Sequence, residues 1–180
     1  MPGGRISPAT LKQVAQAALE KKYGAGDWVA GAWDVSVYLN PAPIARHKLD
    51  PAAVDRAAAQ ALMAMPHIAR VYTREEIAHG EMLQDDIGKL IANGFNPRRG
   101  PDIEVVTDPY WILSDKPASH TSPYGYDVHV PLIFMGPGIR AGRYDGSIAV
   151  NDVAPTLAAI LDVETPGGSV GRVLSEILAP

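Results

Sequence analysis

The sequence of 180 residues contains no cysteine, which excludes disulfide bonds and thiolate metal ligands. A zinc ion held by this chain would need histidine nitrogens and carboxylate oxygens as its ligands. The lack of cysteine leaves the cellular compartment open, because no disulfide framework points to an oxidising one.

Long apolar runs and an excess of basic residues are also missing. No run of eighteen apolar residues occurs, so no membrane-spanning helix is expected. The opening MPGGRISPAT lacks the basic-then-apolar order of an export signal. Basic residues number 16 against 20 acidic ones, without the basic stripe that binding to a phosphate backbone requires. We therefore expect neither a membrane nor a nucleic-acid backbone as partner.

What the sequence does contain is typical of one ordinary globular domain, since 180 residues of which 47% are hydrophobic can bury a core. Ser7-Pro8 has the order of a helix cap and first-turn proline, and Gly24 is placed to end that helix. Residues 33–39 alternate apolar and polar, which predicts a half-buried strand. Asp50-Pro51 then begins a second helix, which runs to Pro66.

The next stretch predicts a further alternation of strands and helices. Residues 67–73 have the character of a short strand, and Thr73 with Glu76 forms a capping box that opens a helical stretch. Strands are expected again at 103–106 and 110–113. The order between about 28 and 114 predicts a small split βαβ, ferredoxin-like layer. The expected division is an N-terminal helix and linker (1–27), this subdomain (28–114) and a C-terminal part (115–180).

The C-terminal part predicts one buried strand and one helix. His129–Met135 is a dense apolar run flanked by turns, which favours a buried strand. Asn151-Asp152 can cap a final helix. The helical spacing of its apolar residues predicts that four side chains face inward: Val153, Leu157, Ile160 and Leu161.

No complete metal or nucleotide site is encoded by a local motif. His-Glu-x-x-His, an adjacent Asp-His pair, a phosphate-binding glycine loop and a Gly-x-Ser-x-Gly elbow are all absent. His47, His67 and His79 have no acidic partner at ligand spacing, and we interpret them as solvated or locally bonded.

His120 differs because it precedes a rigid Pro-Tyr turn that leads into the predicted strand. Ligands of open α/β sheets bind at such a sheet end, so His120 is the candidate metal ligand. Asp127 and His129, two apart on the expected strand, would point to one face and could also meet a metal. We favour the interpretation that Asp127 belongs to a turn and that His129 is hydrogen-bonded locally.

Ser119–Ile139, with the sequence SHTSPYGYDVHVPLIFMGPGI, resembles the C-terminal signature of the alkaline phosphatase superfamily. The similarity is greatest to the branch of monomeric bacterial phosphatases and type I phosphodiesterase/nucleotide pyrophosphatases. NDVAPTLAAIL at 151–161 resembles a packing helix of that family. Three shorter stretches resemble the family's insert between its last two ligand clusters: 35–40, 71–73 and 108–111. The resemblance covers almost the whole chain, while the family's enzymes are roughly three times longer.

The resemblance implies a partial alkaline phosphatase-like sheet, with the split βαβ subdomain inserted, and a site of two zinc ions. In that family a Thr or Ser forms a covalent phospho-enzyme, and His120 maps to the last zinc ligand. The family's nucleophile and its other ligand pairs precede the segment that this sequence resembles. Thr121 stands where the family usually has glycine, and Gly125 stands where an acidic residue is common.

The expected function is therefore that of a C-terminal fragment of a zinc-dependent phosphatase or phosphodiesterase, inactive on its own. The resemblance implies a phosphate ester substrate, monoester or diester, and a periplasmic or secreted location. An exposed sheet edge would favour self-association. The alternative is a standalone, non-catalytic α/β module that binds a ligand or a partner.

Overall fold

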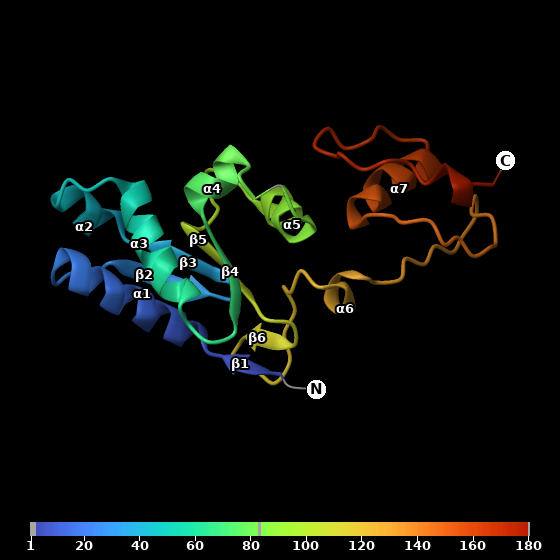
Figure 1. Cartoon of the computed structure of the whole chain (residues 1–180). Coiled ribbons are helices and arrows are strands. Elements are labelled where there is room, and N and C mark those ends of the chain that lie inside the picture. Colours follow the sequence, from blue (N-terminus) through green and yellow to red (C-terminus); the bar gives the residue numbers. More distant parts are fainter. Residues whose placement is uncertain (1–2, 83, 180) are drawn as a thin grey trace. The chain divides into compact units, whose positions relative to one another are not determined.

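The computed structural model describes residues 3–82 and 84–179, which belong to two compact units, Met1–Val130 and Pro131–Pro180. The second unit is built around α7 (Val153–Leu161), which follows the short 3₁₀ turn Val150–Asp152 (Figure 1). The elements of the first unit follow in the order β1 (Gly4–Ile6), α1 (Pro8–Tyr23), β2 (Val29–Trp33), β3 (Ser36–Leu39), α2 (Pro41–Arg46), α3 (Pro51–Met63), β4 (Ile68–Thr73), α4 (Arg74–His79), α5 (Asp86–Gly94), β5 (Ile103–Thr107), β6 (Trp111–Leu113) and α6 (Gly125–Val128).

The main sheet of the first unit has the strand order β2-β3-β5-β4, with every neighbouring pair antiparallel. Strands β3 and β4 are therefore parallel, are separated by β5, and are joined through α2 and α3. Strands β1 and β6 form a separate two-stranded parallel sheet. The mixed α/β class is confirmed. The ferredoxin-like arrangement is not confirmed. A ferredoxin-like chain has the element order βαββαβ, whereas this sheet begins with the hairpin β2-β3 and ends with β5.

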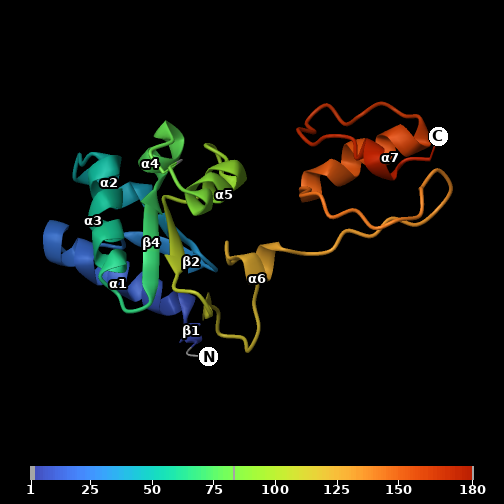
Figure 2. The same cartoon turned by 45° about the vertical axis from the view of Figure 1, so that its right-hand side comes forward.

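Helices α1 and α3 cover one face of the main sheet and form the larger core with it (Figure 1 and Figure 2). Val37, Ile103 and Val105 point to this face, as expected for alternate residues of paired strands. Leu11 and Leu62 pack against them from the two helices. Helix α1 thus shares its core with the strands that follow it, while the three-part division predicted from the sequence stays a prediction.

Helices α4 and α5 lie over only part of the opposite face. Tyr72 of β4 and Val106 of β5 are buried there together with Ile77 of α4, and Ile87 of α5 packs at the edge of this cluster. The neighbouring part of the same face, on β2 and β3, carries Trp33, which is 61% exposed. One half of this face is therefore covered and the other half is open.

Several local predictions are confirmed by the backbone hydrogen bonds. Ser7 and Asp50 cap α1 and α3 with their side-chain oxygens. The Thr73–Glu76 capping box is present, and it begins α4 directly after β4. The expected helical stretch is divided, however, because Gly80 adopts a left-handed conformation (φ 72°) and ends α4 before α5 begins.

The predicted single strand over 33–39 is wrong. The chain reverses at Asp34-Val35, so that Trp33 pairs with Ser36 and two antiparallel strands result. Asp34 has φ 48°, a conformation that aspartate tolerates in turns better than most residues. The alternation of apolar and polar residues continues through the two-residue turn, so the sequence pattern does not distinguish the two strands from one.

The predicted buried strand at His129–Met135 is also wrong. Residues 129–135 form no strand, and Ile133 and Met135 are 84% and 96% exposed. A strand needs a hydrogen-bonded neighbour, and among the described residues none pairs with this run. An apolar run fixes burial only where other elements are present to cover it.

Helix α7 forms as predicted, but it does not bury the side chains expected. Leu157 and Leu161 are exposed, whereas Pro155, Thr156 and Ala158 are buried. The Thr156 hydroxyl donates to the Asp152 carbonyl (2.6 Å) and accepts from the Leu174 amide (3.0 Å). This polar contact holds the C-terminal segment against the other side of the helix, and the leucine face has no cover within residues 131–179.

Candidate functional site

His120 lies on an exposed segment between β6 and α6, and tyrosine side chains fasten that segment to the β5–β6 connection. The Tyr124 hydroxyl donates to the Thr107 carbonyl at 2.8 Å. The Tyr126 hydroxyl accepts from the Tyr110 amide at 2.9 Å, and its ring stacks on that of Tyr110 with centroids 4.8 Å apart. Two hydrogen bonds and a stacked pair therefore hold α6, and the turn before it, at the end of strand β5.

Asp127 closes the turn that follows His120. The Ser122 amide donates to Asp127 Oδ2 at 2.8 Å, and the Tyr124 amide donates to Ser122 Oγ at 3.3 Å. Asp127 lies in α6 and His129 follows that helix, so the prediction that both stand on one face of a strand is wrong. An oxygen of Asp127 is engaged within the turn, in line with the turn role favoured for it.

Thr121, directly after His120, has φ 85°. This is the left-handed half of the φ range, which favours glycine and is unusual for a β-branched residue. The Thr121 hydroxyl donates to the carbonyl of His120 and so bonds within its own turn. Glycine, which the resemblance implies for this position, would adopt this backbone without strain, whereas Thr121 is held in a strained conformation.

The remaining histidines of the first unit have local partners. The His67 ring stacks on Trp111 with centroids 3.6 Å apart, and its Nδ1 lies 3.3 Å from Asp108 Oδ2. The His47 ring packs against that of Trp28. His79 lies at the end of α4, with its Nδ1 3.9 Å from Glu81 Oε1.

A bound metal ion needs several ligands at one place. Within the part of the chain that the structure describes, no group of three or more His, Asp or Glu side chains is placed to hold a metal ion. Catalytic zinc takes three protein ligands. Residues 3–82 and 84–179 therefore do not form a metal site by themselves, and His120 offers a single exposed imidazole.

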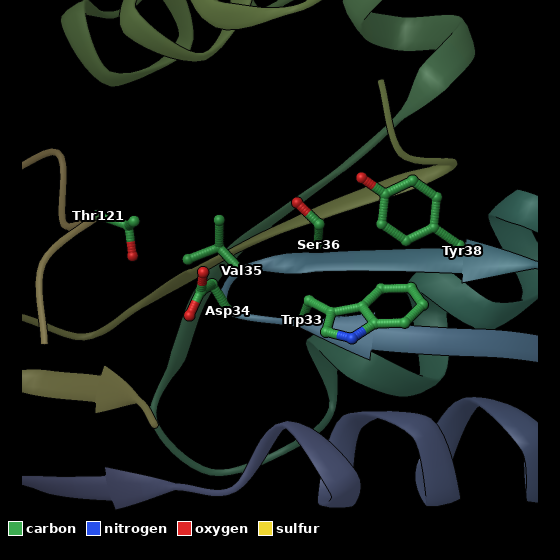
Figure 3. Close-up of a pocket in the computed structure, with 6 residues that line it drawn as sticks. All are labelled: Trp33, Asp34, Val35, Ser36, Tyr38 and Thr121. Atoms are coloured by element: carbon green, nitrogen blue, oxygen red, sulfur yellow. The ribbon is translucent and has the colours of Figure 1, made fainter. Parts of the chain in front are cut away.

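A shallow, open depression lies beside the His120 segment. The close-up in Figure 3 shows Trp33, Ser36 and Tyr38 on the β2–β3 hairpin, with Thr121 on a separate segment facing the hairpin turn. Asp34 and Val35 complete its lining. The sequence analysis missed this surface because it interpreted the hairpin as one strand. The signal that could have indicated it is the pair of aromatic residues, Trp33 and Tyr38, on either side of a turn that contains aspartate.

None of the helices within residues 3–82 and 84–179 combines the length and apolar character that crossing a lipid bilayer requires.

No family model matches the chain. Alkaline phosphatase PafA of Elizabethkingia meningoseptica is 29% identical over 170 residues, which cover 93% of this chain and 31% of that protein. Alkaline phosphatase PhoV of Synechococcus elongatus is 34% identical over 97 residues, covering 53% of this chain and 18% of PhoV. The chain thus spans at most about a third of the length of these relatives.

The crystal structure of wild-type alkaline phosphatase PafA superposes on 99% of this chain with a TM-score of 0.89 and 29% identity, using 34% of the PafA chain. The similarity in fold therefore extends over almost the whole of this chain. Sequence and fold point to the same relatives. The chain belongs to the alkaline phosphatase superfamily and corresponds to a C-terminal portion of such an enzyme.

Proposed function

We propose that this chain is part of a zinc-dependent hydrolase of phosphate esters and that His120 supplies one of its metal ligands. The observation that carries the proposal is the position of His120. It precedes a turn that Tyr124 and Tyr126 fasten to the end of β5, within a fold that matches alkaline phosphatase PafA. An imidazole on an anchored segment is suited to metal binding, because little motion has to be lost when the ion binds.

The chain alone is expected to be inactive. The described residues offer no three-ligand group, and one imidazole does not retain zinc against water. The other ligands and the Thr or Ser nucleophile that the family resemblance implies would come from polypeptide outside these 180 residues. By the same resemblance we propose two zinc ions in the complete site and a monoester or diester of phosphate as substrate.

We also propose that the complete protein works in the periplasm or is secreted, as the family resemblance implies. Fractionation of the source cells, followed by detection with an antibody to this chain, tests the location. Recovery of the protein in the cytoplasmic fraction alone would contradict it.

The test of function uses a chimera in which this chain replaces the matching segment of alkaline phosphatase PafA. We expect hydrolysis of 4-nitrophenyl phosphate that a chelator abolishes and added zinc restores, while the 180-residue chain alone shows none. His120→Ala in the chimera should lower the rate more than about a hundredfold, because a direct ligand is lost. His79→Ala is the matched control, since His79 lies exposed at the end of α4.

Three results would contradict the proposal. The first is chelator-sensitive turnover by the isolated chain, and the second is a His120→Ala chimera as active as its parent. The third is a chimera with native circular dichroism but no turnover, which would favour the standalone binding module. The first unit, with its own buried core, has what such a module requires.

A further inference from the structure

The open half of the main sheet, on the face partly covered by α4 and α5, carries a row of side chains in register. Trp33 pairs with Ser36, Ser36 with Glu104, and Glu104 with Tyr72. Paired residues of neighbouring strands point to the same face. The row therefore runs from the buried Tyr72 under the helices to the exposed Trp33 at the β2 edge.

The indole of Trp33 lies over Gly31, which is two residues earlier on β2 and therefore on the same face of the sheet. Because glycine has no side chain, the ring can lie flat on the sheet. A methyl group at Gly31 would stand 2.3 Å from Trp33 Cη2, so the ring occupies the space that any other side chain would take. Tyr38 packs edge-on against the indole, with centroids 5.4 Å apart and an angle of 64° between the rings. One face of the indole thereby rests on the sheet, and the side chain is 61% exposed; Figure 3 shows Trp33 and Tyr38 together on the hairpin.

The polar groups around this ring are acidic or neutral. The Ser36 hydroxyl lies 3.2 Å from Glu104 Oε2, to which it donates. Burial raises the pKa of the Glu104 carboxyl to about 7, and the Ser36 hydrogen bond acts in the opposite direction. Asp34 lines the same depression, and none of the six lining residues is basic. A doubly charged phosphate would be repelled here, whereas an uncharged ring with a polar substituent would not.

The depression also adjoins the segment that carries the candidate metal ligand. Thr121 contributes to its lining, and Thr121 directly follows His120 along the chain. An aromatic ring resting on Trp33 would therefore lie beside the segment that presents the imidazole. A phosphoryl group attached to that ring would lie outside the acidic depression, on the side of the segment that carries His120.

From this arrangement we propose that the Trp33–Tyr38–Thr121 depression binds the planar, uncharged aromatic ring of the phosphate ester's leaving group, stacked on the indole of Trp33. The inference rests on the proposed function, which it extends from phosphate esters in general to esters of aromatic alcohols. Stacking on aromatic side chains is worth about 0.5–1.5 kcal/mol beyond the area buried.

The test is a binding titration of the whole 180-residue chain labelled with 5-fluorotryptophan, followed by fluorine NMR. Three signals are expected, from Trp28, Trp33 and Trp111, and Trp33→Ala identifies the one of interest. Phenol is the probe, and cyclohexanol is its non-planar match. We expect a saturable shift of the Trp33 signal with phenol and roughly 2- to 12-fold weaker binding of cyclohexanol.

Gly31→Ala provides a variant that keeps the indole but displaces it. It should weaken phenol binding by a similar factor, while Gly146→Ala, where a methyl group meets nothing within 4 Å, should leave it unchanged. Unshifted signals of Trp28 and Trp111 in the absence of probe show that each variant is folded. A Trp33 signal that does not respond to phenol, or responds equally to cyclohexanol, would overturn the inference.

The outcome is separable from that of the proposed function, because the titration needs neither metal nor turnover. A chain that binds phenol on Trp33, in a chimera that hydrolyses nothing, would contradict the proposed function and leave the aromatic site standing. An active chimera whose preference for phenyl over alkyl phosphate is unchanged by Trp33→Ala would overturn only the inference.

Discussion

The backbone at Thr121 allows a prediction in which the sign, and not only the size, of an effect is tested. Thr121 has φ 85°, where a Cβ atom costs about 1–2 kcal/mol. Glycine avoids this cost but loses about 0.4–1 kcal/mol relative to alanine through the greater freedom of its unfolded chain. Thr121→Gly should therefore be more stable than Thr121→Ala by roughly 0.8 kcal/mol, the difference between the midpoints of these two ranges. At an ordinary negative φ the order would be reversed.

Comparing glycine with alanine removes the other differences between the variants. Both lose the hydroxyl that donates to the His120 carbonyl, and both lose the threonine methyl group. Ser119 is the matched control, because it is exposed on the same segment, bonds to the same carbonyl (3.3 Å) and is not among the residues with positive φ. At Ser119 alanine should be the more stable replacement.

The assay is urea unfolding followed by tryptophan fluorescence, with linear extrapolation to water. Trp28, Trp33 and Trp111 all lie in the unit Met1–Val130, so the signal reports the unit that contains Thr121. If Thr121→Ala proves more stable than Thr121→Gly, the conformation assigned to this turn would be refuted.

Three further predictions concern the anchor of the His120 segment, the partly buried Glu104 carboxyl and the exposed apolar run. Tyr126→Phe removes the hydroxyl that accepts from the Tyr110 amide, so hydrogen exchange at that amide should become about tenfold faster. An unchanged exchange rate would contradict the claim that this hydrogen bond anchors the segment. Burial raises the Glu104 pKa from 4.5 to about 7, so the folded state holds the proton more tightly than the unfolded chain. Its stabilising contribution is complete below pH 4.5 and is lost as pH rises towards 7. Glu104→Gln should reduce the fall in unfolding free energy between pH 5 and 7.5 by on the order of 1–2 kcal/mol, and an equally steep fall would contradict the assignment. The exposure of Ile133 and Met135 predicts self-association of the isolated chain, which a monodisperse monomer in light scattering would contradict.

Local signals in the sequence predicted those elements whose ends are fixed by neighbouring residues. The caps at Ser7 and Asp50 and the Thr73–Glu76 box act within a few residues, so their geometry could be predicted without knowing the rest of the fold. The strands at 103–107 and 111–113 were likewise predicted to within a residue.

The failures share a physical cause, which is dependence on partners distant in the sequence. Period-two alternation runs unbroken through a two-residue turn, and only the pairing of Trp33 with Ser36 reveals the hairpin. The apolar run at 129–135 and the leucine face of α7 were assigned to a core by composition. Burial, however, is set by neighbouring elements, and none covers these residues in the described structure.

The candidate site was predicted only as far as His120 itself. Its family resemblance and its place before a Pro-Tyr turn were readable from the sequence. The hydrogen bonds of Tyr124 and Tyr126 to residues 107 and 110 join positions 16 or 17 apart and follow from no periodicity. The approach of Thr121 to the β2–β3 hairpin likewise requires the folded chain.

The central claim is that His120 completes a metal site whose other ligands lie outside these residues. It is tested most directly by the zinc affinity of the chimera with PafA, measured by competition with a chelator. We predict that His120→Ala weakens zinc binding at least about tenfold and that His79→Ala leaves it unchanged. Equal zinc affinity in the parent and the His120→Ala chimera would contradict the account.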